Sequence, residues 1–449
     1  MSKQRIQLSD HFTYPRLLRF VLPCIGTMLF TSIYGIVDGL CVSNFVGKTA
    51  FAAVNLIMPL PMLLGTIGFM LGTGGSAIVG ITLGEGDQKK ADRYFTLFLL
   101  AALVSVSVLA VLGIVFLRPI AVLLGAKGEL LDYAVRYGRI LMVSLPTFAL
   151  QNMFQSFFVT AEKPHLGFWF TVGAGCTNMV LDVLMVGIWG WGVEGAAIAT
   201  FISQLVGGVL PVFYFIDRSN SSRLHLCKTS FYSKVLRDAC INGSSELMTN
   251  LSMSLVNILY NYQLLRLAGE NGVAAYGVIM YAAFLFVAVF VGYAVGSAPI
   301  VSFHYGARNH AEVHNLYRKS LRLIAVVAVT LTLASMFIIP CVARIFVGYD
   351  AELLALTSRA FRLYALSFLI MGFNVYASSF FTALGDGVTS ALISFLRTLV
   401  FQVIAILLLP LLLGIDGIWL AVTAAELAAL AVSAAMLLTK DKVFHYRKA

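Results

Sequence analysis

The feature that most constrains this chain is its succession of long apolar segments. Twelve of them, separated by turns or clusters of charged residues, each contain about 20 residues or more. A helix of about 20 apolar residues is long enough to cross the roughly 30 Å hydrocarbon core of a membrane. We therefore expect twelve membrane-spanning helices, near residues 17–40, 51–83, 94–117, 137–159, 166–188, 193–216, 239–265, 273–303, 321–343, 363–384, 388–413 and 417–438.

The composition agrees with a chain that lies mostly in lipid. Hydrophobic residues make up 59% of the 449 residues and charged residues 12%, whereas a soluble domain has about 25% charged residues. The apolar runs are continuous rather than alternating, which argues against a transmembrane β-barrel. We predict an all-α polytopic membrane protein in which Pro59 and Pro61 kink the second helix. The polar segment Met1–Phe20 runs directly into a full-length apolar run, so we expect no removable signal peptide.

The distribution of basic residues predicts the orientation of the chain. With the N-terminus inside, 21 of the 31 Lys and Arg residues fall on inside segments and 9 on outside loops or adjacent helix ends. Basic residues favour the cytoplasmic side of a membrane. We therefore expect a protein of the cytoplasmic (plasma) membrane with both termini in the cytoplasm. The net charge of +10 is attributed to this topology rather than to nucleic-acid binding.

Short matches at an almost constant offset indicate an internal repeat. Each half holds six of the predicted helices, so both halves enter the membrane from the same side and a pseudo-two-fold axis along the membrane normal should relate them. We expect an N-terminal lobe over 1–216, a cytoplasmic linker over 217–237 and a C-terminal lobe over 238–449. The matching segments, at offsets of 222 or 223, are 51–56 with 273–278, 83–84 with 305–306, 155–158 with 378–381, and 192–195 with 414–417.

The first candidate functional group is Asp182, a carboxylate in the middle of the fifth apolar segment. It is the only formally charged residue between Lys163 and Glu194. On a helix, Asp182 lies roughly 28 Å from Lys163 and about 18 Å from Glu194, which places it well inside the hydrocarbon core. A charge there is costly and by default indicates a functional site. The alternative is an Asp buried against a neighbouring helix for packing specificity.

Other polar groups of the N-terminal lobe accompany Asp182. Asn178 lies one helical turn before it on the same face, and Thr200 supplies a hydroxyl in the sixth helix. Asp38 lies late in the first helix, ten residues before Lys48, where the alternative is an interfacial Asp at a helix end. Carboxylate, amide and hydroxyl oxygens are hard ligands that suit Na⁺. Two carboxylates without a basic partner cannot both stay ionised cheaply, so we predict a coupling-ion site for H⁺ or Na⁺.

The C-terminal lobe differs at the matching positions. Tyr260 and Ile404 stand where the repeat would place the two N-terminal carboxylates. This lobe instead has Glu246, Arg397 and Glu426 within its predicted helices. Arg397 is deep in the membrane and needs a partner, for which Glu246 and Glu426 are the candidates. These charges form either a structural ion pair or a proton-sensitive or substrate-facing carboxylate.

Five short motifs stand in order along the chain: Val37-Asp38-Gly39, Asn178-x-x-x-Asp182, Gly192-Val-Glu-Gly-Ala-Ala-Ile-Ala-Thr200, Gly272-Val-Ala-Ala-Tyr-Gly277 and Ala298-Pro-Ile-Val-Ser-Phe-His-Tyr-Gly-Ala307. In their order and spacing they are similar to those of the multidrug and toxic compound extrusion (MATE) family over essentially the whole chain. The resemblance implies two six-helix lobes around a central cleft and cation-coupled export by alternating access. It also places the cation site on the residue types named above, with Gln155 where the family usually has Asn in the fourth helix. Glu246 resembles a Glu of MepA-like members.

These features favour a secondary antiporter that exports organic cations or amphipathic toxic compounds. Aromatic and Met side chains should line the substrate cleft, because aromatic faces attract organic cations and Met adapts to varied shapes. We expect a monomer among membrane lipids, with no cofactor and no enzymatic activity, since no Walker motif and no nucleophile–base pair stands out. The alternative function is a flippase of a lipid-linked oligosaccharide or related lipid.

Overall fold

The structure is a computed structural model that describes residues 6–46, 48–348 and 350–447, without the side chains of residues 38–45, 48, 51, 342, 345 and 346. Over these residues every regular element is a helix. The N-terminal half contains α1 (Tyr14–Val46), α2 (Lys48–Ile57), α3 (Pro59–Gly84), α4 (Gln88–Leu123), α5 (Glu129–Thr160), α6 (Pro164–Asp182), the π-helix η1 (Val183–Ile188), α7 (Gly192–Gly208) and α8 (Leu210–Ile216). The C-terminal half contains α9 (Ser233–Gly306), α10 (His310–Val347), α11 (Ala351–Ala365), α12 (Phe368–Ala383), α13 (Gly387–Phe395), the π-helix η2 (Leu396–Val400), α14 (Phe401–Leu413), α15 (Ile415–Thr439) and α16 (Asp441–Phe444).

The twelve predicted spans are all helical over the described residues, apart from short breaks. The second span breaks between α2 and α3 at Met58, directly before Pro59, as the two prolines predicted. The seventh and eighth spans run together as the 74-residue α9, which is interrupted only at Gly269, where φ is 61°. The tenth span is bent by 46° between α11 and α12, a break that the sequence analysis did not predict.

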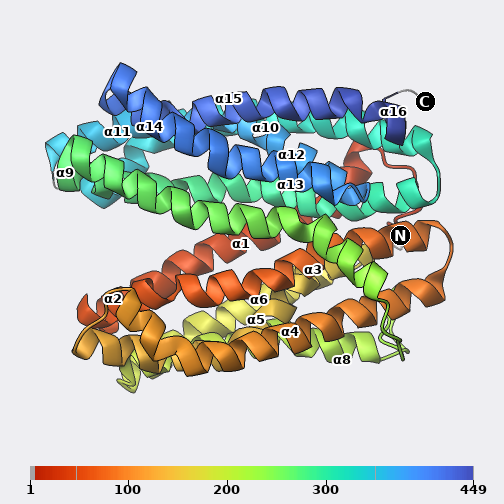
Figure 1. The fold of residues 1–449 in the computed structure, drawn as a ribbon, viewed down its shortest axis with the longest axis horizontal. Helices are drawn as coiled ribbons and strands as arrows, with labels where there is room; N and C mark the ends of the chain where they lie inside the picture. The colour runs from red at the N-terminus through yellow and green to blue at the C-terminus, as the bar shows by residue number, and fades with distance from the viewer. Residues whose placement is uncertain (1–5, 47, 349, 448–449) are drawn as a thin grey trace.

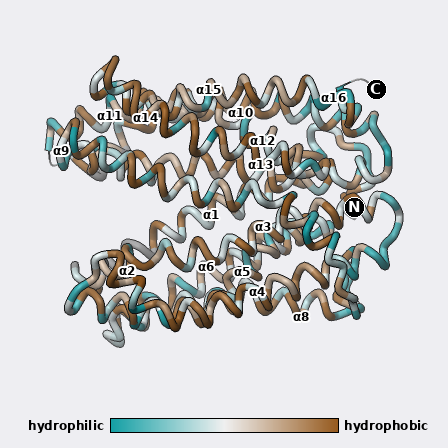
Figure 2. The backbone as a smooth tube through the Cα atoms, in the orientation of Figure 1, coloured by the Kyte–Doolittle hydropathy of each residue, from teal (hydrophilic) through white to brown (hydrophobic). Residues whose placement is uncertain are grey.

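Length and composition support a membrane location for most of these helices. Over the described residues, nine helices are long and apolar enough to cross a membrane, or up to ten if the bent pair α11 and α12 is one span. With 74 residues, α9 is long enough to cross twice. Figure 2 shows apolar residues along the middle of the helices and polar residues mainly in the connections at the two ends. The chain is therefore a multi-pass membrane protein.

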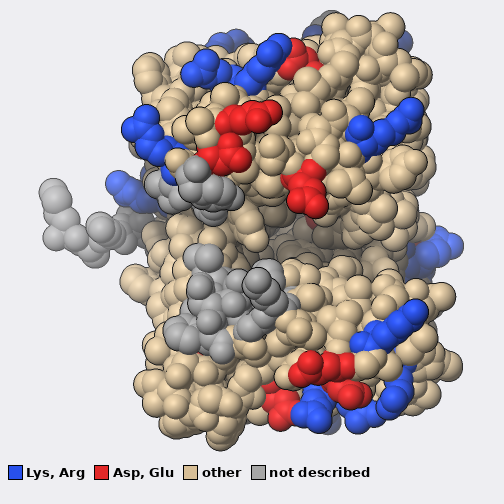
Figure 3. All heavy atoms as spheres, turned by 90° about the vertical axis from the view of Figure 1, so that its left-hand side faces the viewer, with Lys and Arg blue, Asp and Glu red and all other residues tan. Residues whose placement is uncertain are grey.

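The helices gather into two halves that lie side by side. Figure 1 shows α2 to α8 in one half and α9 to α16 in the other, with α1 running along the seam between them. Both termini lie at the same end of the molecule, which we call the terminal end. At the opposite end the two halves separate, and Figure 3 shows a hollow between them.

The connections show the internal repeat in their backbone conformation. Three pairs of residues at offsets of 222 or 223 adopt positive φ in equivalent turns, even where one member is not glycine. Helix starts repeat as well: Asp87 caps α4 and Asn309 caps α10, each accepting a backbone N–H three residues later. The turn pairs are Gly86 with Arg308 (φ 88° and 55°), Glu162 with Gly385 (60° and 82°), and Gly192 with Gly414 (59° and 60°).

Glycines close the seam between the halves near the terminal end. A methyl group added to Gly74 of α3 would overlap the backbone of Ala239 in α9, and one added to Gly243 would overlap the Met70 carbonyl. At Gly292 an added methyl would lie 2.5 Å from the Cα of Ile25 in α1. Backbones of the two halves therefore touch directly across the seam at these glycines.

Candidate functional site

Asp182 ends α6 and is completely buried, with 0% of its surface exposed. Asn178, one turn earlier, is 2% exposed, so the two side chains share the face of α6 that packs into the N-terminal half. The π-helix η1 begins at the next residue, Val183. π-Helical turns often occur at functional sites. The predicted pair of polar groups is thus buried inside protein rather than exposed to lipid.

The packing of α7 on α6 brings Thr200 to the same depth. Gly195 of α7 lies against Met185, and Gly173 of α6 lies against Val206, so the two helices run antiparallel in a defined register. In this register Thr200 is opposite the segment between Asn178 and Asp182. Its hydroxyl donates to the Ala196 carbonyl at 3.0 Å, and its oxygen lone pairs leave it able to accept or to bind a cation.

The first helix passes the same face of α6. Phe30 and Tyr34 of α1 pack on Gly175, where an added methyl would lie 2.5 Å and 3.3 Å from their rings. Position 38 comes one turn after Tyr34 in α1, which brings its backbone toward the level of Asn178 and Asp182. The side chain of Asp38 is outside the described residues, so its predicted role stays a prediction.

Tyr137 of α5 is a neighbour that the sequence analysis missed. Its side chain is 1% exposed and belongs to the same buried cluster as Val186 and Ala197. Gly208 of α7 lies against the Thr147 backbone of α5, which sets Tyr137 about level with Ala197 in these two helices, and the α6–α7 register places Ala197 opposite Asp182. Nothing in the sequence distinguished this Tyr from the other 17, because its proximity to α6 depends on packing through α7.

Gln155, the predicted amide of the fourth helix, lies elsewhere. It lines a small cavity with Thr27, Pro164 and Gly167, at the start of α6. Pro164 is separated from Asp182 by 18 residues of helix, about 27 Å. Gln155 lies near the end of α5, beside the turn that leads into α6, whereas Asp182 is the last residue of α6. The structure thus does not bring Gln155 to Asp182.

In the C-terminal half, Arg397 of η2 pairs with Glu426 of α15. Its Nε donates to Oε1 and Oε2 of Glu426 at 2.8 and 3.1 Å, and the two side chains are 12% and 0% exposed. Asn374 of α12 donates to Oε2 of the same carboxylate at 2.7 Å, and Ser433 donates to Asn374 at 2.9 Å. Of the two predicted partners, Glu426 forms the ion pair with Arg397, while Glu246, half-buried on α9, lies within electrostatic reach of the same guanidinium.

The two positions that break the repeat are apolar or aromatic in the structure. Tyr260 stacks on Tyr276 with ring centroids 4.9 Å apart and donates to the Ile418 carbonyl at 3.2 Å. Ile404, predicted to correspond to Asp182, is 48% exposed, whereas Ile406 is fully buried. The pairing of Ile404 with Asp182 stays a prediction, in which an isoleucine stands where the N-terminal lobe has its carboxylate.

Residues 6–13, which precede α1, cross the seam at the terminal end, and we call them the strap. The Leu8 N–H donates to Oε1 of Glu162 at 2.9 Å, in the N-terminal half. The Phe12 N–H donates to Oε1 of Glu312 at 2.9 Å, in the C-terminal half. Leu8 and Phe12 are 0% exposed. The strap therefore joins the two halves through two carboxylates that are themselves nearly buried.

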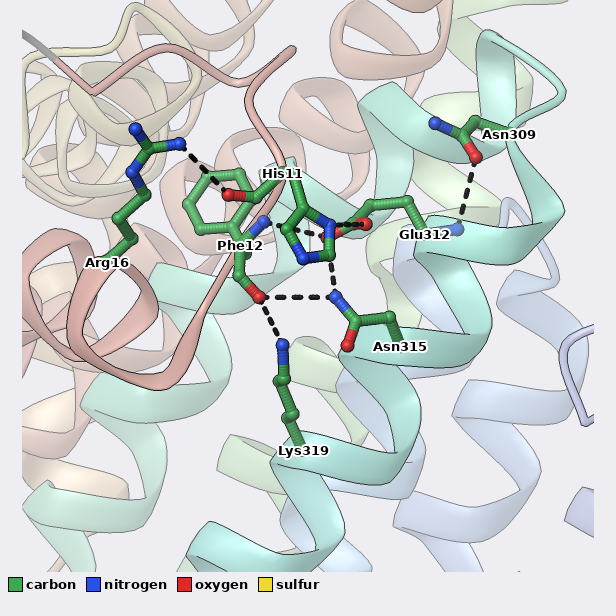
Figure 4. Close-up of polar contacts among 7 residues, drawn as sticks. All are labelled: His11, Phe12, Arg16, Asn309, Glu312, Asn315 and Lys319. Carbon is green, nitrogen blue, oxygen red and sulfur yellow. Dashed lines mark hydrogen bonds and ion pairs between the residues drawn. The ribbon is translucent and has the colours of Figure 1, made fainter.

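Figure 4 shows how the C-terminal half holds the strap. Glu312 also pairs with Nδ1 of His11 at 2.6 Å and accepts from Asn315 at 2.8 Å. The carbonyl of Phe12 accepts from Lys319 at 2.6 Å and from Asn315 at 3.2 Å. Hydrogen bonds to charged groups are stronger than neutral ones, so this network is a firm attachment. Sequence patterns do not predict this network, since the two segments are about 300 residues apart.

Over the described side chains, which leave out that of Asp38, no group of three His, Cys, Asp or Glu is arranged to hold a metal ion. The N-terminal site instead combines a carboxylate with amide and hydroxyl oxygens. Fold and site together define a two-lobed helical membrane protein with a buried carboxylate in one lobe and a closed seam at one end.

Comparison with known proteins gives the family. The MatE family model matches this chain twice, over residues 23–184 and 247–408, which together make up well over half of it. The chain belongs to the MatE family. The two matches, one in each half of the chain, agree with the predicted internal repeat.

Named relatives cover almost the whole chain at low identity. The multidrug export protein MepA of Staphylococcus saprophyticus is 21% identical over 433 residues, covering 95% of this chain and 94% of that protein. A structure described as the outward-facing conformation of a multidrug resistance MATE family transporter has a TM-score of 0.91 at 23% identity, with 100% of both chains covered. A MATE structure in the straight conformation has a TM-score of 0.91 at 22% identity, also with 100% of both chains covered. These likenesses support the fold predicted from the sequence.

Proposed function

We propose that this protein is a cation-coupled antiporter that exports cationic or amphipathic organic compounds by alternating access. Its family and the multidrug export proteins among its relatives support export. The proposal that ion binding is coupled to transport rests on Asp182, a completely buried carboxylate beside Asn178 and at the depth of Thr200. The relatives named above are export proteins, so the comparisons give the lipid-flippase alternative no support.

The coupled ion is H⁺ or Na⁺, bound by oxygen atoms of the N-terminal lobe. A buried carboxylate is costly when charged, so taking up a proton or a cation lowers the free energy of the site. The packing of α1 on α6 at Gly175 then links the state of Asp182 to the position of α1. We propose that ion binding shifts α1, weakens the substrate site in the cleft and releases the substrate outward.

The available free energy is sufficient for such coupling. One charge crossing a potential of 100 mV yields about 2.3 kcal/mol, and one pH unit yields about 1.4 kcal/mol. Coupling free energies between two sites are typically about 1–3 kcal/mol. The ion gradient therefore covers the cost of transport without nucleotide hydrolysis.

We place the terminal end in the cytoplasm, which the distribution of Lys and Arg favours. The hollow of Figure 3 then faces outward, toward the side where substrate is released. An inward-facing state requires the seam to open, so the strap must leave Glu162, Glu312 or both during the cycle. We propose a monomer in the plasma membrane that binds no nucleic acid, with Glu246 as a substrate-facing candidate.

The decisive experiment is efflux of a cationic dye in proteoliposomes, with Na⁺ and pH gradients imposed separately. Wild type should extrude dye under one of the two gradients, which identifies the ion. Asp182→Asn should reduce gradient-driven efflux to background, while Asp132→Asn, an exposed carboxylate on α5, should leave it unchanged. Both variants must insert and elute as wild type does. Undiminished efflux by Asp182→Asn would overturn the coupling role of this residue.

A further inference from the structure

A groove on the lipid-facing side of the N-terminal half lies between the beginnings of α1 and α6. It has a volume of about 470 Å³, within the roughly 300–1,000 Å³ typical of small-molecule sites. One wall is a single face of α1 and the other is the first turn of α6. Neither wall contains Asp182 or any other residue of the proposed coupling site, so the groove is a separate feature.

The groove forms because two helices that touch further along the chain diverge toward the terminal end. Gly26 has no side chain, so the Phe168 ring approaches to 3.0 Å from where a Cβ would be. From this contact the groove runs back to Pro15, over 11 residues of α1. That is about 16 Å of helix, close to half of the roughly 30 Å hydrocarbon core. The groove therefore spans one leaflet.

The two ends of the groove differ in chemistry. Leu22, Pro23 and Phe168 make its deeper part apolar, and Leu22 is 57% exposed, which leaves the groove open to the bilayer. Arg19 and His165 lie nearer its terminal end and are both exposed. No described carboxylate lies within ion-pair distance of Arg19. A cation without a carboxylate partner thus stands beside the apolar slot.

We propose that this groove binds an anionic phospholipid of the surrounding bilayer, with an acyl chain along Leu22 and Phe168 and the headgroup phosphate on Arg19. Basic pockets between membrane helices are suited to anionic headgroups, and Arg pairs with phosphate oxygens in a bidentate geometry. His165 supplies a further hydrogen-bond donor to the same headgroup. The lipid lies against Pro23 within α1, the helix that the proposed transport cycle moves.

Native mass spectrometry of the full chain in detergent tests this, with phosphatidylglycerol and phosphatidylcholine titrated separately. Wild type should bind phosphatidylglycerol more tightly. Arg19→Gln should weaken phosphatidylglycerol binding about fivefold, the effect of one basic residue near an anionic headgroup, and phosphatidylcholine binding less, because its choline cation offsets the charge of its phosphate. Leu22→Trp, which fills the slot from an exposed position, should weaken the binding of both lipids.

The matched control is Arg318→Gln, an exposed Arg on α10 that does not line the groove. It should bind both lipids as wild type does. Inorganic phosphate at millimolar concentration should not displace phosphatidylglycerol, since it cannot occupy the apolar slot. The proposal is overturned if Arg19→Gln and Leu22→Trp bind phosphatidylglycerol normally, if Arg318→Gln loses as much affinity as Arg19→Gln, or if phosphate alone competes. Size-exclusion profiles establish that each variant is folded.

Discussion

Gly84 and Gly306, which are 222 positions apart, contact each other's helices reciprocally across the seam. A methyl group added to Gly84 would overlap the carbonyl of Phe303, and one added to Gly306 would overlap the carbonyl of Ile81. Phe303 and Ile81 are themselves 222 positions apart, so the contact is the same on both sides, as a two-fold interface requires. The internal repeat therefore builds the closed end of the molecule out of equivalent surfaces.

The first prediction follows from this contact. Gly84→Ala should destabilise the closed arrangement by about 1–3 kcal/mol, the usual cost of overpacking, because the clash is with backbone and no side chain can move aside. The matched control is Gly277→Ala, a glycine of α9 with open space around its Cα; it should be neutral or slightly stabilising. Thermal unfolding in detergent measures both, and an unchanged midpoint for Gly84→Ala would count against a rigid seam.

The second prediction concerns the strap. Glu312→Ala removes the acceptor of the Phe12 N–H and the partner of His11, so the strap should detach more often and the seam should open more often. Cys24 reports this opening, since it is buried where α1 meets Gly296 of α9. In a variant that keeps Cys24 as its only cysteine, Glu312→Ala should accelerate alkylation severalfold.

The control for the strap is Glu85→Ala, which removes an exposed carboxylate at the same end of the molecule. It should leave the alkylation rate of Cys24 unchanged. Equal rates for the Glu312 variant and wild type would show that the strap does not hold the seam closed.

The third prediction concerns the Arg397–Glu426 pair. Glu426→Gln removes the carboxylate that pairs with a nearly buried guanidinium, which should cost about 3–5 kcal/mol of stability. Replacing both residues, as Arg397→Met with Glu426→Leu, should recover most of the loss. As a comparison, Asp416→Asn breaks the more exposed pair with Arg359 and should cost at most about 1 kcal/mol. If Glu426→Gln unfolds at the wild-type midpoint, the pair is not structural.

The fourth prediction is a dependence of stability on pH at the turn before α13. Burial raises the pKa of the Asp386 carboxyl, but Lys440 at 2.8 Å and the Thr389 donors outweigh it and hold the pKa below its ordinary value. A carboxyl whose pKa is depressed in the folded state stabilises that state at pH values above the ordinary pKa of about 3.9. This contribution disappears as the pH falls through the depressed pKa.

Asp386→Asn removes the negative charge but keeps a side chain that can cap the start of α13, so it tests the charge alone. Wild type should be more stable by at most about 1 kcal/mol between pH 5 and 8, and the difference should vanish on acidification below about pH 4. Unfolding midpoints of both proteins across this range provide the measurement. A difference that grew at low pH would contradict the assigned sign.

Much of the site was predictable because it depends on depth in the membrane. The distance of Asp182 from the nearest charges along the chain placed it inside the hydrocarbon core, and the structure shows it completely buried. Thr200 was chosen by its hydroxyl and its position in the sixth helix, and the α6–α7 register brings it close. Gln155 was chosen because the family resemblance puts an amide in the fourth helix, and the structure places it on α5 beside the start of α6, far from Asp182.

The sequence by itself determined the membrane spans, the duplication and the polar positions inside the spans. Each span must be long and apolar enough to cross the hydrocarbon core, and this requirement applies to each segment independently of its neighbours. Only the tertiary structure decided that Arg397 pairs with Glu426, that Tyr137 lies at the depth of Asp182 and that the strap crosses the seam. Such contacts depend on how each helix is rotated and which distant helix lies beside it. Local apolar patterns do not encode that choice, because most faces of these helices are apolar.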